Sequence, residues 1–202
     1  GGHAADEVAS RMAIETLELK IDEGAGQPER QLREAMEEAN RKILRDQQAH
    51  PERRGMGTTL SALWLSPEKD DQGWIGHIGD SRVYRFRSNE LNQLTEDHSP
   101  LYRLYKEGSL DKEQLRHHPQ KNLIERSLGL SAGIETDIFS IDLQKGDLFI
   151  LCTDGLSDCL SDRELSEVCR NTKLEDVVGV LIDRALQCGG YDNITVVVAQ
   201  IL

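Results

Sequence analysis

Three features are missing from the sequence, and each absence excludes a class of protein. No apolar run approaches the roughly 18 residues that a membrane-spanning helix needs, so we expect no membrane partner. There is no excess of positive charge: 24 Lys and Arg stand against 36 Asp and Glu, which gives a net charge of −12 and argues against nucleic acid as the main partner. The four cysteines, Cys152, Cys159, Cys169 and Cys188, include no CxxC pair, which disfavours a zinc or redox site and indicates a reducing, cytoplasmic setting.

The sequence also has no internal repeat, no linker and no low-complexity segment. With 38% hydrophobic and 30% charged residues, the chain is expected to be globular, soluble and able to bury a core. Its length of 202 residues suits one sizeable domain better than two. We therefore predict a single domain over residues 1–202, acting as a monomer.

Apolar residues recur with a helical period in several parts of the chain. Residues 3–21 and 28–50 predict two amphipathic helices, and residues 162–171 and 173–188 predict two more. Residues 98–128 show a helical period interrupted by breaks. The side chains expected to face inward in the first two helices are Val8, Met12, Ile14, Leu17 and Leu19, followed by Leu32, Met36, Ala39, Ile43 and Leu44.

Strand-like runs occupy the stretches between the helices. A sharp GDS turn follows one of these runs, and a tight QKGD turn joins two others. The pattern predicts an α+β domain of antiparallel sheets covered by helices. The predicted strands cover residues 58–65, 73–80, 82–88, 133–143, 147–154 and 192–202.

Acidic residues stand at the ends of three of these segments. They are Asp97 in TEDHS, Asp154 and Asp158 in TDGLSD, and Asp192 in YDNIT. Each turn alone has a structural explanation, because Asp caps helices and favours turns. If the strands that carry Asp154 and Asp192 are neighbours, however, their carboxylates converge, and two carboxylates about 4 Å apart repel by roughly 4 kcal/mol at an effective dielectric of 20. Such a cluster needs protons or cations, and oxygen ligands favour Mg²⁺ or Mn²⁺.

Seven motifs occur in the order found in PP2C-type, metal-dependent protein serine/threonine phosphatases, and the sequence most resembles the compact bacterial members. The order and spacing of the motifs carry this resemblance, which spans residues 1–199. It implies an α+β fold, a β-sandwich of two antiparallel sheets flanked by helix pairs. The motifs are GGHAADEVAS, GMGTTL, HIGDSRVYR, LTEDHS, RSLG, GDLFILCTDGLSD and GGYDNITVVV.

The resemblance also implies roles for the acidic residues. Asp154 resembles the aspartate that the family's metal sites share, and Asp192 resembles the one that completes the first metal site. Asp97 and Asp158 resemble the ligands of a third, weaker site. The implied Mn²⁺ or Mg²⁺ ions activate a water that attacks the phosphorus of phosphoserine or phosphothreonine in line, without a phosphoenzyme. The implied partners are phosphoproteins, the substrates of a serine/threonine kinase in bacterial signalling.

The first residues depart from the family pattern. Gly1-Gly2-His3 matches the tail of the family's DGMGGH motif, so the metal-bridging aspartate would stand three positions before Gly1. That aspartate, the strands before it and a phosphate-holding arginine are not in the sequence, and we expect a longer natural chain. If the residue three positions before Gly1 is not Asp, the alternative is a catalytically inactive, phosphatase-like regulatory or binding domain. His3 is three positions beyond the place of the family's acid histidine, which favours a structural role over general acid catalysis.

The remaining motifs allow simpler interpretations. Asp80 in GDSR is expected to bond local backbone, with contact to the metal ligands as the alternative, and Arg82 is expected to pair with an acidic neighbour. His98 is expected at the surface or in a helix cap. The GMGTTL segment, residues 55–60, lacks the Lys of a phosphate loop and is expected to serve tight backbone packing. Residues 98–128 resemble the family's variable flap beside the active site.

Overall fold

The computed structural model describes residues 5–22, 27–65 and 71–202. Gly1, Gly2 and His3, on which the expectations about the N-terminal motif depend, lie outside the described residues. No helix in the described part of the chain is both long and apolar enough to cross a membrane. The chain forms two compact units, a first unit of residues 1–79, 98–100 and 122–142 and a second unit of residues 80–97, 101–121 and 143–202.

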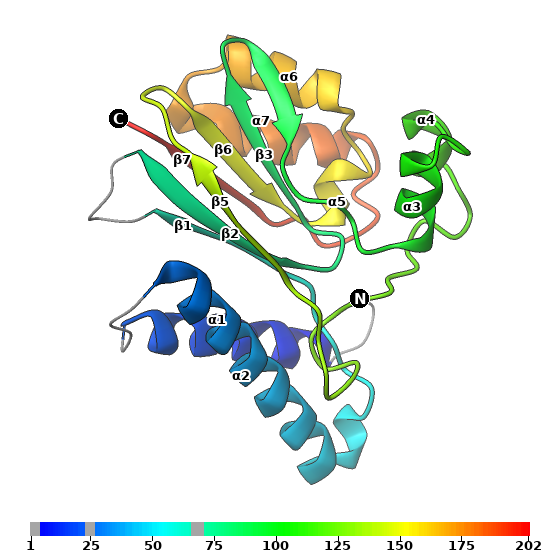
Figure 1. Cartoon of the computed structure of the whole chain (residues 1–202). Helices are drawn as coiled ribbons and strands as arrows, with labels where there is room; N and C mark the ends of the chain where they lie inside the picture. The colour runs from blue at the N-terminus through cyan, green and yellow to red at the C-terminus, as the bar shows by residue number, and fades with distance from the viewer. Residues whose placement is uncertain (1–4, 23–26, 66–70) are drawn as a thin grey trace. The chain divides into compact units, whose positions relative to one another are not determined.

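The first unit combines two long helices with a three-stranded antiparallel sheet (Figure 1). Its elements are α1 (Asp6–Asp22), α2 (Pro28–Ala49), the 3₁₀ helix η1 (Pro51–Arg53), β1 (Leu60–Leu65), β2 (Gln72–Ile78) and β5 (Asp137–Asp142). The strand order is β1-β2-β5. α1 and α2 lie side by side, and α2 packs on β2 and β5.

The buried face of α1 differs from the predicted stripe. Ala9, Ala13 and Leu17, which follow one another at intervals of four, are buried and pack against α2. Ile14 and Leu19 are more than half exposed, so the prediction was wrong for these two. The small alanines let the two helices approach closely, and the hydrophobicity of single residues does not reveal that requirement.

The buried face of α2 is largely as predicted. Leu32, Met36, Ala39 and Ile43 are fully buried, whereas Leu44 is half-buried. Pro28 begins the helix, which suits its fixed φ and its missing N–H. The apolar period of the sequence therefore places this helix and its inward side correctly.

The second unit combines a four-stranded antiparallel sheet with helices. Its elements are β3 (Arg82–Arg87), β4 (Glu90–Gln93), α3 (Pro100–Lys106, from Leu101 onward), α4 (Lys112–Arg116), β6 (Leu148–Cys152), α5 (Asp154–Ser157), α6 (Asp162–Asn171), α7 (Leu174–Gln187) and β7 (Val196–Gln200). The strand order is β4-β3-β6-β7. Two antiparallel sheets, each with a helix pair, confirm the predicted α+β class.

The register of the second sheet decides which residues meet at its edge. Cys152, the last residue of β6, lies opposite Arg82 at the start of β3 and opposite Val196 at the start of β7. The segment that precedes β3, the segment that follows β6 and the segment that precedes β7 therefore leave the sheet at the same end. These three segments carry Asp80, Asp154 and Asp192.

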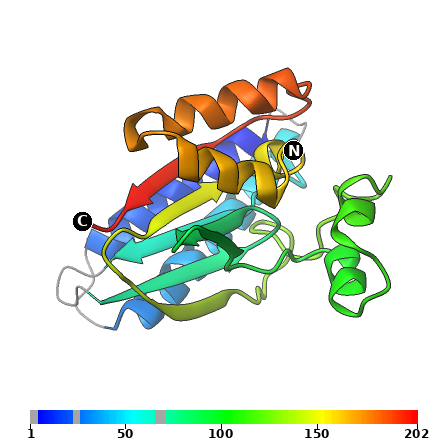
Figure 2. The same ribbon diagram turned by 90° about the horizontal axis from the view of Figure 1, so that it is seen from above.

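Helices α6 and α7 run beside one another on the second unit's sheet (Figure 2). Ser161 and Glu164 form a reciprocal capping box at the start of α6, which fixes its first turn. The predicted helices 162–171 and 173–188 are confirmed. Their buried side chains are Leu165, Val168, Val177, Leu181 and Ala185.

Two parts of the second unit differ from the sequence prediction. Strand β4 was not predicted; it pairs with β3 through a two-residue turn in which Ser88 and Asn89 both have positive φ, at 52° and 67°. Such a turn matches the twist of the paired strands. The expected helical segment 98–128 contains only the short helices α3 and α4, because the breaks predicted within it end each helix after two turns or fewer.

Candidate metal centre

Asp154 is held where the central strand of the second sheet ends. It is the first residue of α5 and follows the buried strand β6 after one residue, Thr153. The backbone N–H of Gly155 donates to Asp154 Oδ1 at 2.9 Å, which fixes the direction of the carboxylate. A rigid, apolar strand thus delivers a half-buried carboxylate to the edge of the sheet.

The loop that carries Asp192 is tied to the same strand exit. Thr153 Oγ1 donates to the carbonyl of Asn193 at 3.1 Å and accepts the N–H of Thr195 at 3.0 Å. Asp192 is exposed, and its Oδ1 accepts the N–H of Asn193 at 2.7 Å. The expectation that the strands bearing Asp154 and Asp192 are neighbours is confirmed by the pairing of β6 with β7.

Gly155 makes this close approach possible. A Cβ atom at this position would lie 2.4 Å from the carbonyl oxygen of Asn193, far inside any normal contact. Only glycine lets the exit of β6 pass so near the loop before β7. The TDG sequence therefore sets Asp154 and Asp192 close together through the backbone.

The electrostatics of Asp154 show surplus negative charge at this edge. Burial raises the pKa of Asp154, and the nearby carboxylates of Asp192 and Asp158 raise it further. Asp158 lies one helical turn further on, and its N–H donates to the Asp154 carbonyl at 2.8 Å. The structure therefore places two of the predicted site residues, Asp158 and Asp192, within electrostatic reach of a third, Asp154.

The fourth predicted site residue, Asp97, stands in a different environment. It is 9% exposed and is held by Arg82, whose Nη2 donates to Oδ2 at 2.6 Å and whose Nε donates to Oδ1 at 2.9 Å. Gln93 Nε2 donates to Asp97 Oδ1 at 3.1 Å. The predicted pairing of Arg82 with an acidic neighbour is confirmed, and it leaves the Asp97 oxygens engaged by donors.

Asp80 is the acidic residue that the sequence prediction undervalued. Burial, with the neighbouring carboxylates of Asp154 and Asp97, raises the pKa of Asp80 to about 7. Asp80 therefore lies within electrostatic reach of both Asp154 and Asp97. The sequence signal for this was the position of Asp80 two residues before strand β3.

The donor set suits a hydrated divalent cation. No three His, Cys, Asp or Glu side chains within residues 5–22, 27–65 and 71–202 lie close enough together to hold a metal ion by themselves. Mg²⁺ and similar hard cations keep several waters and need only one or two carboxylates. Asp154 and Asp192 supply such oxygens, and the raised pKa of Asp154 marks the place where a cation would relieve repulsion.

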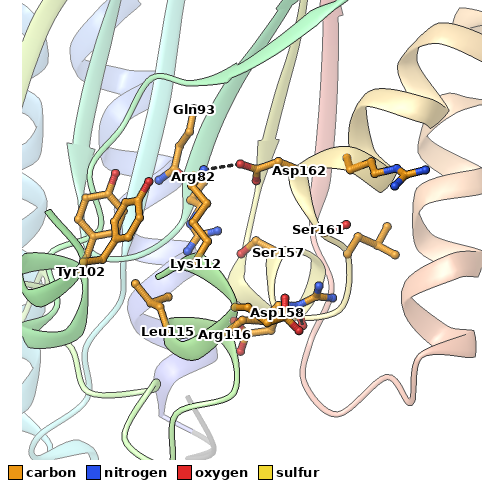
Figure 3. Close-up of a pocket in the computed structure, with 14 residues that line it drawn as sticks. Arg82, Gln93, Tyr102, Lys112, Leu115, Arg116, Ser157, Asp158, Ser161 and Asp162 are labelled. Atoms are coloured by element: carbon orange, nitrogen blue, oxygen red, sulfur yellow. Dashed lines mark hydrogen bonds and ion pairs between the residues drawn. The ribbon is translucent and has the colours of Figure 1, made fainter. Parts of the chain in front are cut away.

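Basic side chains of residues 112–121, in and after helix α4, contact Asp158 and Asp162. Lys121 forms an ion pair with the Asp158 carboxylate, and Arg116 Nε donates to the Asp158 carbonyl at 2.8 Å. Lys112 pairs with Asp162 at 2.5 Å. Figure 3 shows Lys112, Arg116, Asp158 and Asp162 among the residues that line a cavity of about 210 Å³. Residues 112–121 are therefore held beside Asp158 and Asp162 by three cationic side chains.

The fold and this sheet edge together define an α+β protein with a cluster of acidic residues suited to binding a cation. Comparison with known proteins assigns the chain to a family. Residues 1–188 match the model of the family described as protein phosphatase 2C. The chain belongs to this family, as its motifs predicted.

Individual relatives agree with the family match. The serine/threonine phosphatase Stp of Listeria monocytogenes is 36% identical over 206 residues, covering 99% of this chain and 81% of that protein. The crystal structure of the Mycobacterium tuberculosis serine/threonine phosphatase PstP/Ppp is 37% identical with a TM-score of 0.90, covering 100% of this chain and 84% of that chain. A structure of the PstP catalytic domain in complex with two manganese ions is 35% identical with a TM-score of 0.89, covering 100% and 84%.

Proposed function

We propose that this chain is a metal-dependent protein phosphatase that hydrolyses phosphoserine and phosphothreonine in proteins. The observation that carries the proposal is the half-buried Asp154 carboxylate, whose pKa is raised by burial and by the nearby carboxylates of Asp192 and Asp158. An acidic protein needs cations at its site to attract a phosphate dianion, and this edge offers the place for them. Relatives that are named serine/threonine phosphatases support the same activity.

The residues have distinct tasks in this proposal. Asp154 and Asp192 would hold Mn²⁺ or Mg²⁺ ions, whose chemistry when bound is to lower the pKa of water and to neutralise phosphoryl oxygens. Thr153 and Gly155 fix the positions of the two carboxylates through the backbone. Asp80 extends the negative field toward Asp97.

A third and weaker ion at Asp97 and Asp158 remains part of the proposal. Each of these carboxylates already has a cationic partner, Arg82 for Asp97 and Lys121 for Asp158. An incoming cation must displace or share these partners, which explains in physical terms why such a site would be weak.

The wider assignments follow from the proposed activity. The substrates would be phosphoproteins made by a serine/threonine kinase, and we propose a cytoplasmic monomer formed by a single domain over residues 1–202. The four cysteines without a CxxC pair support a reducing setting. Sedimentation of the purified protein tests the monomer.

The deciding experiment is a metal-dependent assay on the full-length protein. Hydrolysis of a small aryl phosphate and of a phosphothreonine peptide should require Mn²⁺ and stop with EDTA. Turnover that persists in EDTA would contradict the metal mechanism. Binding of phosphopeptide without turnover at any Mn²⁺ concentration would favour the alternative, a phosphatase-like regulatory domain.

A further inference from the structure

His98 is buried and uses every polar group it has. Its side chain and backbone are 7% exposed, which contradicts the expected surface or capping position. Its N–H donates to the Gly79 carbonyl at 2.8 Å, and its carbonyl accepts the N–H of Glu125 at 2.8 Å. Its Nδ1 accepts the N–H of Gly79 at 3.1 Å, and its Nε2 lies 3.2 Å from Asp137 Oδ2. A histidine with this set of partners has a single orientation.

The hydrogen bonds also fix the tautomer of the ring. Because Nδ1 accepts the Gly79 N–H, the ring proton sits on Nε2 and points to Asp137. The ring of His77 packs against His98 with centroids 4.8 Å apart, and Ser61 Oγ lies 2.9 Å from His77 Nδ1. Asp137 and His77 therefore hold the imidazole so that Nδ1 faces Gly79.

The partner of this ring is a glycine that cannot be replaced or moved easily. Gly79 has a φ of +111°, and a Cβ atom there would lie 2.3 Å from Thr59 Cγ2. Gly79 and His98 thus exchange two hydrogen bonds, one from each N–H. This reciprocal pair joins the turn before β3 to the loop after β4.

The same two segments are joined further along within the second unit. The N–H of Leu94 donates to the Val83 carbonyl at 2.8 Å, and the N–H of Val83 donates to Thr95 Oγ1 at 3.0 Å. The Arg82–Asp97 ion pair follows as the next link. These contacts extend the β3–β4 hairpin beyond its last paired residues, and the Gly79–His98 pair is the final link.

Two acidic residues are direct chain neighbours of this final link. Asp80 follows Gly79, and Asp97 precedes His98. We propose that His98 is a positioning residue for the metal centre: its bonds to Gly79 set the backbone from which Asp80 and Asp97 project. This inference rests on the proposed phosphatase function for its activity readout, whereas its metal-binding readout is independent of turnover.

A matched pair of variants tests the contacts of the two ring nitrogens separately. In His98→Asn the amide oxygen can accept the Gly79 N–H in place of Nδ1, whereas in His98→Gln the longer side chain reaches toward Asp137 and leaves that N–H unpaired. We expect His98→Asn to keep kcat within about fivefold of the wild type, and His98→Gln to lose about tenfold to a hundredfold with KM nearly unchanged. The exposed His117→Gln, which removes only the contact with Glu113, serves as the control and should match the wild type.

Mn²⁺ titration followed by electron paramagnetic resonance gives the second readout. His98→Gln should bind Mn²⁺ several-fold more weakly than His98→Asn. Equal Mn²⁺ affinity and equal kcat in the two variants would overturn the proposal, as would a greater loss in His98→Asn than in His98→Gln. If the wild type binds Mn²⁺ but turns over no substrate, the proposed function fails, and the Mn²⁺ affinities alone still decide the role of His98.

Discussion

The two ends of strand β6 carry aspartates of opposite character. At its start, Asp147 is fully buried and receives Arg87 Nε at 2.6 Å, Arg87 Nη2 at 2.5 Å and the N–H of Gln144 at 2.9 Å. Burial alone would raise the pKa of Asp147, but the Arg87 and Gln144 hydrogen bonds and the Arg87 charge lower it overall. At the other end, no Lys or Arg in the described part of the chain forms an ion pair with Asp154, whose pKa is raised.

The difference is the one expected between a carboxylate that stabilises the fold and a carboxylate that serves the proposed metal site. The protein supplies its own cation to Asp147, so the negative charge stabilises the fold. It places further carboxylates near Asp154, so the negative charge there opposes folding, and a cation bound at the proposed site would relieve this repulsion. The five residues of β6 and Thr153 therefore separate a carboxylate that stabilises the fold from the carboxylate of the proposed metal site.

Removing the charge of Asp154 should have the largest effect of the substitutions at the two ends of β6. Asp154→Asn should lower kcat by at least about a thousandfold, because the shared metal ligand is lost. Its melting temperature without metal should equal or exceed that of the wild type, because a carboxylate with a raised pKa is destabilising when ionised. Steady-state kinetics and calorimetry check both points, and substantial remaining activity would contradict the metal assignment.

The same substitution at the other end of the strand should have the opposite effect. Asp147→Asn should lower the free energy of unfolding by about 3–5 kcal/mol, because the largely buried Arg87 loses its carboxylate. The activity of the protein that remains folded should be unchanged. Urea denaturation measures the loss, and the double variant with Arg87→Met should recover part of it. A stable Asp147→Asn would show that the ion pair is dispensable.

The dependence of stability on pH should distinguish the two regions as well. Between the pKa of an unfolded aspartate, about 3.9, and about 7, folded Asp80 holds a proton that the unfolded chain has released. The free energy of unfolding of the chelated protein should therefore fall as the pH rises from about 4 to about 7. The lowered pKa of Asp147 acts in the other direction, since its contribution is lost as the pH falls below about 4. Denaturation curves measured at several pH values should show that the free energy of unfolding of Asp80→Asn depends less on pH above pH 4 than that of the wild type. An unchanged pH dependence would exclude Asp80 as its cause.

The smallest expected effect concerns the partner of Asp158. Lys121→Gln should free that carboxylate and strengthen the weakest Mn²⁺ site by up to about fivefold, because a partly exposed ion pair contributes at most about 1 kcal/mol. Calorimetric titration with Mn²⁺ measures this affinity. Lys173→Gln, at an exposed pair elsewhere, is the matched control and should change nothing. Weaker binding in Lys121→Gln would mean that Lys121 helps to shape the site.

Local patterns in the sequence predict much of the fold. The apolar period and the Ser161–Glu164 capping box define α6, and the apolar run before TDG defines β6. Strand β4 escaped prediction because it has only four residues, three of them polar, and because the Ser88–Asn89 turn lacks the usual glycine. Elements that depend on their own residues were predictable, whereas an edge strand that depends on its neighbour was not.

The site divides in the same way. The strand ends that carry Asp154 and Asp192 could be predicted to meet once the two strands were assumed to pair. The surroundings of Asp80 and the burial of His98 could not, because they arise from contacts such as that of His98 with Asp137, 39 residues away in sequence. The sequence motifs show which residues are available, and long-range packing decides their electrostatic environment.

The absence of a side chain at Gly155 affects the spacing of the carboxylates of Asp154 and Asp192. Because the backbone of the strand exit touches the Asn193 carbonyl region directly, the separation of Asp154 and Asp192 is inherited from the register of β6 and β7. In the proposed metal site, the backbone would hold the two carboxylates near each other before an ion binds, which would lower the entropic cost of binding. By allowing this close approach, Gly155 lets the pairing of β6 with β7 set the geometry of the proposed cation site.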